Sequence, residues 1–261
     1  AFELREGSPA GYRFQVIGEP DDDPLELLGK LIGKMRRALA LTHLEDTDLG
    51  PQVNDGLVLR GTVDSDPDDD HRVPMVIIDG RTLKIEGMVS TGAFAQTTVS
   101  PDRSEIYVAT AYYTKLNRGE RIEEILVYDA NTLALKAEIP YPARHSQSLP
   151  YLATLRTSAD GRFILVQNAT PATSIGVVDR QLGQMVAEIQ TPGCFGVYPA
   201  QSALRVSTLC GDGTMLTISL DADGKPVGKQ KSPQFFDPDG DALFVAPAQD
   251  GDTYYFPSFK G

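Results

Sequence analysis

The stretch GRFILVQNATPATSIGVVD, residues 161–179, contains two apolar runs separated by a polar segment that includes Pro171. Two such runs around a short break are typical of a β-hairpin. The second run also opens a phrase that recurs: apolar residues ending in Asp, a polar turn, then an alternating strand ending in Val or Ile. Its copies, VIIDGRTLKIEGMV, LVYDANTLALKAEI and GVVDRQLGQMVAEI, span residues 76–89, 126–139 and 176–189, 50 residues apart, and a weaker copy spans 217–230. The hairpin is therefore one unit of a repeat.

A second recurring unit precedes each of these hairpins, a turn of the Ser-x-Asp type followed by a strand. Its copies span residues 97–110, 155–168, 198–210 and 245–258. Together the two units supply about four short antiparallel strands per repeat. Self-similarity at about 40 to 50 residues with four strands per unit is typical of a propeller blade. We expect a mainly β fold, a partial β-propeller of about four blades over residues 71–261, with an ordinary β-sandwich as the alternative.

The first 70 residues differ in kind. Leu25, Leu28, Leu31, Ile32, Met35 and Leu39 lie on one face of a helix expected at about residues 24–44. Asp23 can cap this helix and Pro24 suits its first position. Segments 12–18 and 57–63 have strand character, and 64–70 (DSDPDDD) is a plausible acidic linker. We therefore expect a small N-terminal α/β unit at residues 1–70.

Composition and charge exclude several classes of function. The chain has 261 residues, of which 41% are hydrophobic, with 24 Gly and 18 Pro, as in a loop-rich globular protein. A net charge of -12 opposes binding to phosphate backbones, so we expect no nucleic-acid partner. The apolar runs are far shorter than the roughly 20 residues that cross a bilayer, so we expect no membrane segment. No signal peptide is visible at the N-terminus, as would also hold for a processed start.

No self-contained catalytic or metal-binding motif is visible. The histidines His43, His71 and His145 form none of the common metal-ligand spacings. The acidic run that starts at Asp64 has Asp69 where a calcium loop requires Gly and Met75 where it requires Glu. No nucleophile elbow, Walker loop or dinucleotide fingerprint occurs. We expect no metal site and no catalytic residue in this chain, and a self-sufficient hydrolase is disfavoured.

Two cysteines, Cys194 and Cys210, are 16 residues apart and bracket one predicted hairpin. A disulfide between them would contribute about 3 kcal/mol by the loop-closure argument. The residues alone leave open the alternative of two reduced thiols in the core.

Four segments resemble a known family. NRGERIEEILVYDANTL (117–133), NATPATSIGVVD (168–179), GCFGVYP (193–199) and TLCGDGTMLTISL (208–220) resemble the heavy chain of quinone-cofactor amine dehydrogenases. Within that family they look most like the large subunit of aromatic amine dehydrogenase, with the methylamine enzyme as a cousin. The resemblance covers about residues 76–261, whereas residues 1–75 are weakly similar to a small bacterial domain of unknown function.

The resemblance implies a function that is shared between two chains. Heavy chains of this family are seven-bladed periplasmic propellers, longer by about three blades than the part matched here. They pair with a light chain that holds tryptophan tryptophylquinone, which oxidises a primary amine and passes electrons to a blue copper protein. This chain would then hold no cofactor and would be the non-catalytic scaffold. The alternative is a protein-interaction module, built on a truncated propeller with an unrelated N-terminal domain.

The resemblance also assigns three residues. Phe94, in STGAFAQTTVSPD (90–102), stands where the family places a phenylalanine that lines the substrate channel. An aromatic wall there would exclude water and pack against an apolar amine substituent. The alternative is a loop phenylalanine that closes the end of a blade. The family pairs cysteines at the positions of Cys194 and Cys210, which favours the disulfide and an oxidising compartment.

Overall fold

The computed structural model describes residues 57–60, 74–78, 85–115, 118–145, 147 and 151–260. The predicted helix at 24–44, the acidic linker at 64–70, and Asp79 lie outside these residues, as does nearly all of the predicted N-terminal unit. The described part is almost entirely β-structure and contains no α-helix, only one 3-10 turn, η1 (Leu152–Thr154).

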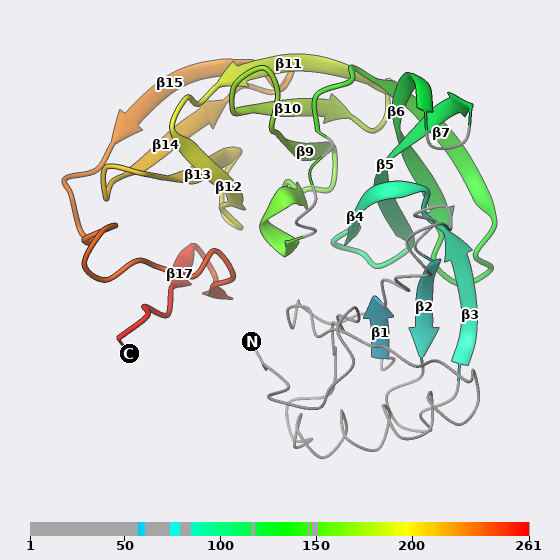
Figure 1. Ribbon diagram of the computed structural model, residues 1–261, viewed down its shortest axis with the longest axis horizontal. Coiled ribbons are helices and arrows are strands. Elements are labelled where there is room, and N and C mark those ends of the chain that lie inside the picture. Colours follow the sequence, from blue (N-terminus) through cyan, green and yellow to red (C-terminus); the bar gives the residue numbers. More distant parts are fainter. Residues whose placement is uncertain are drawn as a thin grey trace.

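Three four-stranded antiparallel sheets form the body of the described chain, each built from strands consecutive in sequence. Their strands are β4 (Ala93–Val99), β5 (Glu105–Lys115), β6 (Arg118–Asp129) and β7 (Leu135–Tyr141); β8 (Leu155–Thr157), β9 (Phe163–Asn168), β10 (Ser174–Asp179) and β11 (Gln184–Gln190); and β12 (Cys194–Pro199), β13 (Arg205–Cys210), β14 (Met215–Leu220) and β15 (Pro226–Lys231). The sheets follow one another in an arc, with β4 and β12 toward its centre and β11 and β15 on its outside (Figure 1). The first strand of the middle sheet, β8, contacts both β4 and β12. The partial propeller is thus confirmed.

Two smaller sheets flank the body in sequence. At one end, β1 (Leu57–Arg60), β2 (Pro74–Ile78) and β3 (Ile85–Ser90) form a three-stranded sheet, and at the other β16 (Ala248–Asp250) pairs with β17 (Thr253–Tyr255). The strand predicted at 57–63 within the N-terminal unit belongs instead to the first of these sheets. Its backbone pairs antiparallel with β2, Leu57 opposite Ile78, and long-range pairing of this kind is invisible in local sequence. The rest of the boundary near residue 70 stays a prediction.

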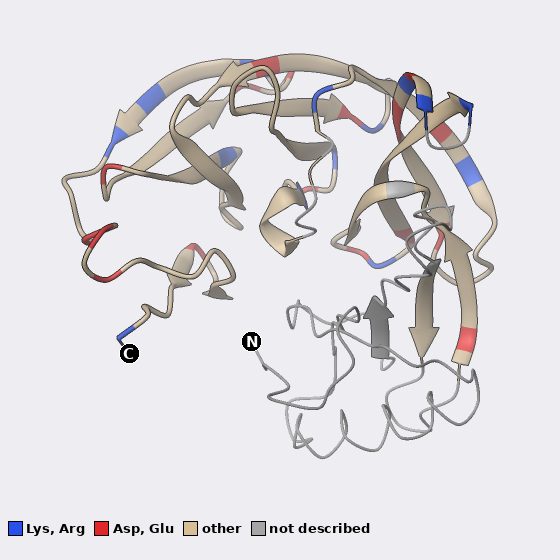
Figure 2. Cartoon of the chain, in the orientation of Figure 1, with Lys and Arg blue, Asp and Glu red and all other residues tan. Residues whose placement is uncertain are grey.

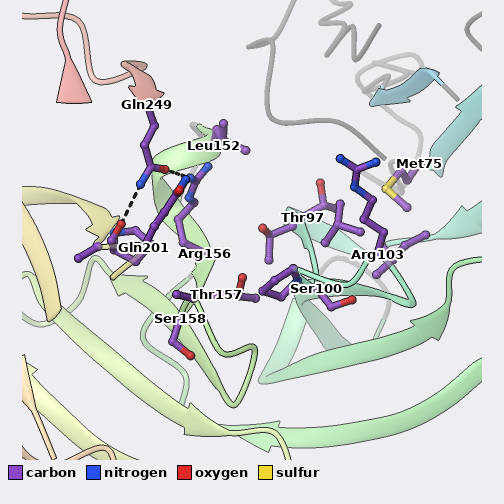
Figure 3. Close-up of a pocket in the computed structure, with 17 residues that line it drawn as sticks. Met75, Thr97, Ser100, Arg103, Leu152, Arg156, Thr157, Ser158, Gln201 and Gln249 are labelled. Atoms are coloured by element: carbon purple, nitrogen blue, oxygen red, sulfur yellow. Dashed lines mark hydrogen bonds between the residues drawn. The ribbon is translucent and has the colours of Figure 1, made fainter. Parts of the chain in front are cut away.

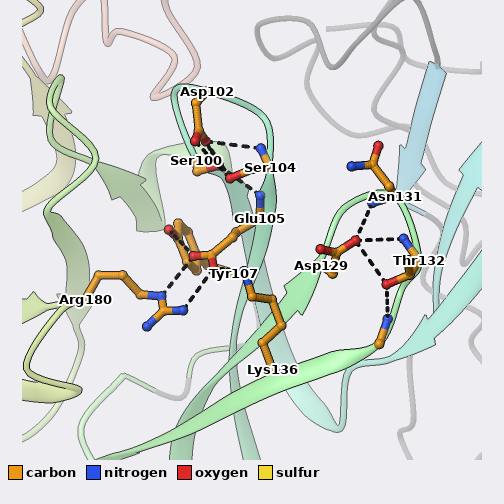
Figure 4. Close-up of polar contacts among 11 residues, drawn as sticks. Ser100, Asp102, Ser104, Glu105, Tyr107, Asp129, Asn131, Thr132, Lys136 and Arg180 are labelled. Carbon is orange, nitrogen blue, oxygen red and sulfur yellow. Dashed lines mark hydrogen bonds and ion pairs between the residues drawn. The ribbon is translucent and has the colours of Figure 1, made fainter.

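The recurring aspartate of the repeat closes the turn between the third and fourth strands of each sheet. The Asp129 carboxylate accepts backbone N–H bonds from Asn131 at 3.0 Å and Thr132 at 2.8 Å (Figure 4). Asp179 accepts the N–H groups of Gln181 and Leu182 in the same way. Such Asx turns satisfy backbone donors that a tight turn would leave unpaired. This requirement explains why the phrase repeats.

The Ser-x-Asp turns between first and second strands are also alike in detail. Ser100 Oγ donates to Asp102 at 2.6 Å and accepts the N–H of Glu105 at 3.0 Å (Figure 4). Ser158 does the same with Asp160 at 2.5 Å and the N–H of Phe163 at 3.0 Å. The same Ser-x-Asp pattern therefore forms the same turn in these two sheets.

In the third sheet this turn, at residues 200–204, has neither the serine nor the aspartate at those positions. Its backbone donors are satisfied from the next hairpin, where Asp252 accepts the N–H groups of Gln201 at 2.6 Å and Ser202 at 2.9 Å. Asp252 also pairs with Arg205 at 3.0 Å. The distant carboxylate thus replaces the local one and ties the β16–β17 hairpin to the third sheet.

The core lies between neighbouring sheets. One cluster joins the first two four-stranded sheets, and a second joins the middle sheet to the third. Alternate residues of β9 belong to different clusters. Ile164 and Val166 pack in the cluster shared with the first four-stranded sheet, and Phe163 and Leu165 pack in the cluster shared with the third. Every residue of β9 and β10 is buried. This explains why the stretch 161–179 has nearly continuous apolar runs, because both faces of its strands are covered.

The outer edge of the third sheet is exposed and basic. All six residues of β15 are exposed, and its ribbon carries blue segments that mark lysine in Figure 2. Lys229 Nζ donates to the carbonyl of Gln190 on β11 at 3.0 Å, and Lys225 Nζ donates to that of Val186. Lysine on an edge strand opposes pairing with another chain, and here it also links two sheets.

Glu105 forms the main polar bridge between the first and middle four-stranded sheets. Its carboxylate accepts two bonds from Arg180, both at 2.9 Å, one from Lys136 at 2.5 Å and one from Tyr107 at 2.9 Å (Figure 4). Burial alone would raise the pKa of Glu105, but the bonds from Arg180, Lys136 and Tyr107 lower it to about 2. The carboxylate therefore stays charged in the folded protein.

We expect Glu105→Gln to lower the free energy of unfolding at pH 7 by about 2 kcal/mol, because it leaves two cations partly buried without their counter-charge. The native pKa of Glu105 lies below the ordinary value of 4.5, so this stabilisation is present above pH 4.5 and is lost as the pH falls toward 2. Urea unfolding at pH 7, 4 and 3 measures it. The exposed Glu86→Gln is the control, and a difference between wild type and Glu105→Gln that stays constant as the pH falls would contradict the assignment.

Candidate functional site

Phe94 lies in a β-bulge at the start of β4. The pairing of β4 with β5 shifts between Ala93, opposite Ala111, and Gln96, opposite Ala109. Phe94 has a left-handed φ of 53° and follows Gly92 with φ 66°. A bulky residue in this region is rare, and such backbone persists only where the surroundings hold it. The bulge turns the Phe94 ring outward, with 37% of the residue exposed, while Gln96 beside it is fully buried.

Two further apolar side chains are exposed on the same four-stranded sheet as Phe94. Tyr112 and Ile122 are cross-strand partners on β5 and β6, with 36% and 47% of the residue exposed. A side chain at Gly92 would meet the Tyr112 ring at 2.9 Å, so this ring covers the backbone two residues before Phe94. We call Phe94, Tyr112 and Ile122 the Phe94 surface. An aromatic patch of this kind suits an apolar ligand group or a partner chain.

A buried carboxylate holds the loop behind this surface. Glu123 on β6 is 2% exposed and accepts the N–H groups of Arg144 at 2.7 Å and His145 at 2.8 Å. Arg121 Nε lies 3.0 Å from the other carboxylate oxygen and balances its charge. Arg121 also donates through Nη2 to the carbonyl of Ala143 at 2.7 Å, so this bond and the two N–H bonds to Glu123 fix residues 143–145 against the first four-stranded sheet.

His145 sits in this loop with no exposed surface. Its Nε2 lies 3.0 Å from the carbonyl oxygen of Thr110, so Nε2 carries the proton and Nδ1 is a bare acceptor. Burial lowers the pKa of His145, against the opposing effect of the Glu123 carboxylate, and the imidazole is neutral. In the described part of the chain, His145 Nδ1, Gln96 Oε1 and Thr91 Oγ1 have no hydrogen-bond partner. His145 and Glu123 are buried, and the His145 carbonyl accepts a hydrogen bond from Gln96 of the bulged strand at 3.5 Å, so these residues support the bulge from within the protein.

A second network continues from this loop into the middle sheet. Tyr141 donates to Asn168 at 2.8 Å, and Asn168 donates to Ser174 at 3.0 Å. Ser174 then donates to Glu188 at 2.8 Å, and Arg144 pairs with both oxygens of Glu188 at 2.7 and 2.8 Å. The polar residues that interrupt the stretch 161–179 therefore connect two sheets at the same end as Phe94.

The two cysteines form a disulfide, as the resemblance implied. Cys194 begins β12 and Cys210 ends β13, and the two are directly opposite in the ladder with a Cα–Cα distance of 3.9 Å. Both residues are buried. Since β4 and β12 occupy the same place in their sheets, the disulfide lies at the same end of the strands as Phe94, but in a different sheet.

Within the described ranges, no group of three or more His, Cys, Asp or Glu side chains could hold a metal ion. Of the three histidines only His145 lies in these ranges. No helix in the described part is long and apolar enough to span a bilayer.

Comparison with known proteins shows to which family the chain belongs. Residues 62–261 match the family model described as methylamine dehydrogenase heavy chain. The chain belongs to this family. The heavy chain of Methylophilus methylotrophus is 25% identical over 199 residues, covering 75% of this chain and 48% of the relative. That of Methylobacillus flagellatus is 26% identical over 188 residues, covering 70% and 46%. The chain therefore spans about half the length of these methylamine dehydrogenase heavy chains.

Two further matches bear on fold and organisation. Dihydro-heme d1 dehydrogenase NirN, solved in complex with DHE, superposes with a TM-score of 0.50 at 19% identity, covering 74% of this chain and 37% of NirN. At that identity the likeness shows the fold alone. Residues 1–40 match a separate domain of unknown function (DUF7686), so the methylamine dehydrogenase heavy chain match does not extend to the N-terminus.

The family resemblance pointed to Phe94 and to the disulfide, of which the disulfide is present in the structure, but the sequence did not indicate the network around Glu123 and His145. Glu123 and His145 are 22 residues apart on different elements, and Gln96 bonds across 49 residues. The only sequence clue was that Glu123 lies just before the repeat phrase at 126–139. Its burial could not be read from one sequence.

Proposed function

We propose that this chain is the scaffold subunit of a periplasmic quinone-dependent amine dehydrogenase, with Phe94 lining the path by which a primary, aromatic amine reaches the cofactor of a partner light chain. Electrons from the amine then pass to a blue copper protein. The proposal rests chiefly on the Phe94 bulge, a half-exposed aromatic ring in left-handed backbone. Family membership supplies the context in which such a ring has a use.

The composition of the chain agrees with a cofactor on the partner. Its 261 residues include no tryptophan, so none of them can be converted into a tryptophan-derived quinone. When bound in the light chain, tryptophan tryptophylquinone supplies an electrophilic carbonyl and accepts two electrons. This chain contributes a rigid aromatic wall that excludes water and offers a flat apolar face to the amine substituent. The buried Glu123 and His145 keep that wall in place.

Phe94→Ala tests the proposal in a complex reconstituted with the light chain of an aromatic amine dehydrogenase. We expect kcat/KM for benzylamine to fall about tenfold, or about 1.4 kcal/mol, because the ring contact is lost. The value for methylamine, which has no ring to contact, should change less than about twofold. Amine-dependent dye reduction measures both.

Phe259→Ala is the matched control, since Phe259 is 69% exposed near the C-terminal end and should leave both amines unaffected. Equal losses for the two amines, or none, would remove Phe94 from the substrate path. If Phe94→Ala chiefly lowers the melting temperature, the ring closes the blade instead.

A second candidate is the protein-interaction module, which the separate family match at residues 1–40 favours. Failure of the chain to form a complex with the light chain of either an aromatic amine or a methylamine dehydrogenase would favour this candidate over the first.

A further inference from the structure

A cavity of about 400 Å³ lies at the other end of the first strands from Phe94. It is lined by the ends of β4 and β8 and by the turns that follow β4, β8 and β12 (Figure 3). Phe94 is close to the first residue of β4 and Ser100 follows its last, and a strand of this length spans roughly 20 Å at ~3.3 Å per residue. The cavity is therefore separate from the Phe94 surface.

The charge of the lining is opposite to that of the chain. The chain carries 36 acidic and 24 basic residues, yet the described lining includes two arginines, Arg103 and Arg156, and no aspartate or glutamate. Both side chains extend into the cavity from different sides, Arg103 from the Ser-x-Asp turn and Arg156 from β8 (Figure 3). A concave site with like charges and no counter-charge concentrates ions of opposite sign.

Neither guanidinium is neutralised by a carboxylate of the described residues. Arg156 donates to the side-chain oxygen of Gln249 at 3.0 Å, a neutral partner. The nearest acid in sequence to Arg103 is Asp102, whose carboxylate is occupied by Ser100 and Ser104. A partly buried cation without a counter-charge is costly, and an incoming anion removes that cost.

The backbone at Arg103 is held in an unusual conformation. Its φ of 61° lies in the left-handed region, which is uncommon for a residue with a long side chain. The turn itself is fixed by the bonds of Ser100 and Asp102. Arg103 is thus presented by a rigid turn, which lowers the entropy lost when its guanidinium binds a ligand.

The remaining polar groups of the lining suit an oxyanion. The side chains of Thr97, Thr157 and Gln201 line the cavity, and each can donate a hydrogen bond. Guanidinium groups bind carboxylate and phosphate oxygens through two parallel bonds, which gives both affinity and orientation. A volume of about 400 Å³ is within the range of about 300–1,000 Å³ typical of small-molecule sites.

We propose that this cavity is a binding site for a small organic anion, whose carboxylate or phosphate oxygens are held by Arg103 and Arg156. The anion joins the turn after β4 to β8 and so bridges the first and middle four-stranded sheets. Its binding does not depend on the amine dehydrogenase activity, since Phe94 and the bulge lie at the opposite end of β4.

Isothermal titration of the full chain with succinate and with inorganic phosphate tests the proposal and separates the two oxyanion types. We expect saturable binding of at least one, and none of the uncharged succinamide. Arg103→Gly should weaken binding at least about tenfold while keeping the turn, because glycine suits a φ of 61°. Arg156→Gln should weaken it similarly. The bound anion should also raise the melting temperature of the wild type but not that of Arg103→Gly.

Arg118→Gln is the matched control, since it removes the same charge from an exposed residue outside the cavity lining. Affinity in this variant should equal that of the wild type. If neither anion saturates the chain below ~10 mM, or if Arg118→Gln weakens binding as much as Arg103→Gly, there is no anion site in the cavity. Circular dichroism of Arg156→Gln shows whether its loss of binding reflects unfolding, and Arg103→Gly then decides alone.

Discussion

Replacing Cys194 and Cys210 together with alanine is expected to lower the free energy of unfolding by about 3 kcal/mol, because the disulfide closes a loop of about 16 residues in the unfolded chain. The bond joins β12 to β13 at the end of the strands where Phe94 also lies. Alanine leaves no polar atom in these buried positions. Guanidinium unfolding monitored by circular dichroism gives the difference.

The wild type unfolded in the presence of dithiothreitol is the internal control, since its midpoint should approach that of the double alanine variant. Addition of dithiothreitol to the variant should change nothing, because no other cysteine is present in the chain. A loss of less than about 1 kcal/mol in the free energy of unfolding, with both the wild type and the variant unfolding cooperatively, would mean that the disulfide restricts the unfolded chain little.

The sequence predicted the repeated sheets because the same local chemistry recurs. Asp129 and Asp179 each close a turn by accepting two backbone N–H bonds, and Ser100 and Ser158 each bond to the aspartate two residues on. These contacts span five residues or fewer, so the spacing of residue types in one sequence is enough to expose them.

Contacts between elements were not predictable in the same way. Asp252 caps a turn about 50 residues earlier, and β1 joins a sheet across a segment outside the described residues. The position of Phe94 came from resemblance, whereas its left-handed backbone did not, since only the glycine two residues before it hinted at a special conformation. Pairing between distant segments depends on the whole fold, which local patterns do not encode.

One departure from the repeat has a structural cause. At the first position of the recurring phrase, two copies have Val76 and Leu126, whereas the third has Gly176. A Cβ at Gly176 would overlap the Tyr141 hydroxyl and lie 2.9 Å from the ring carbon that carries it. Tyr141, from the neighbouring sheet, fills the space and donates to the buried Asn168 at 2.8 Å. Gly176 has no positive φ, so its backbone conformation does not require glycine. Glycine is required because Tyr141 of the neighbouring sheet leaves no room for a side chain.

Gly176→Ala is therefore expected to lower the free energy of unfolding by about 3 kcal/mol, through overpacking and loss of the Tyr141–Asn168 bond. In a Tyr141→Phe background the overlapping oxygen is absent, so the same substitution should cost at least about 1 kcal/mol less, a coupling that a double-mutant cycle in urea measures. Gly228→Ala is the matched control, because a Cβ there meets no atom within 4 Å, and it should change stability by less than about 0.5 kcal/mol. Costs that simply add, or a Gly176→Ala variant as stable as Gly228→Ala, would show that Tyr141 does not pack against β10. The inter-sheet packing that fixes the positions of the first and middle four-stranded sheets would then have to be assigned differently.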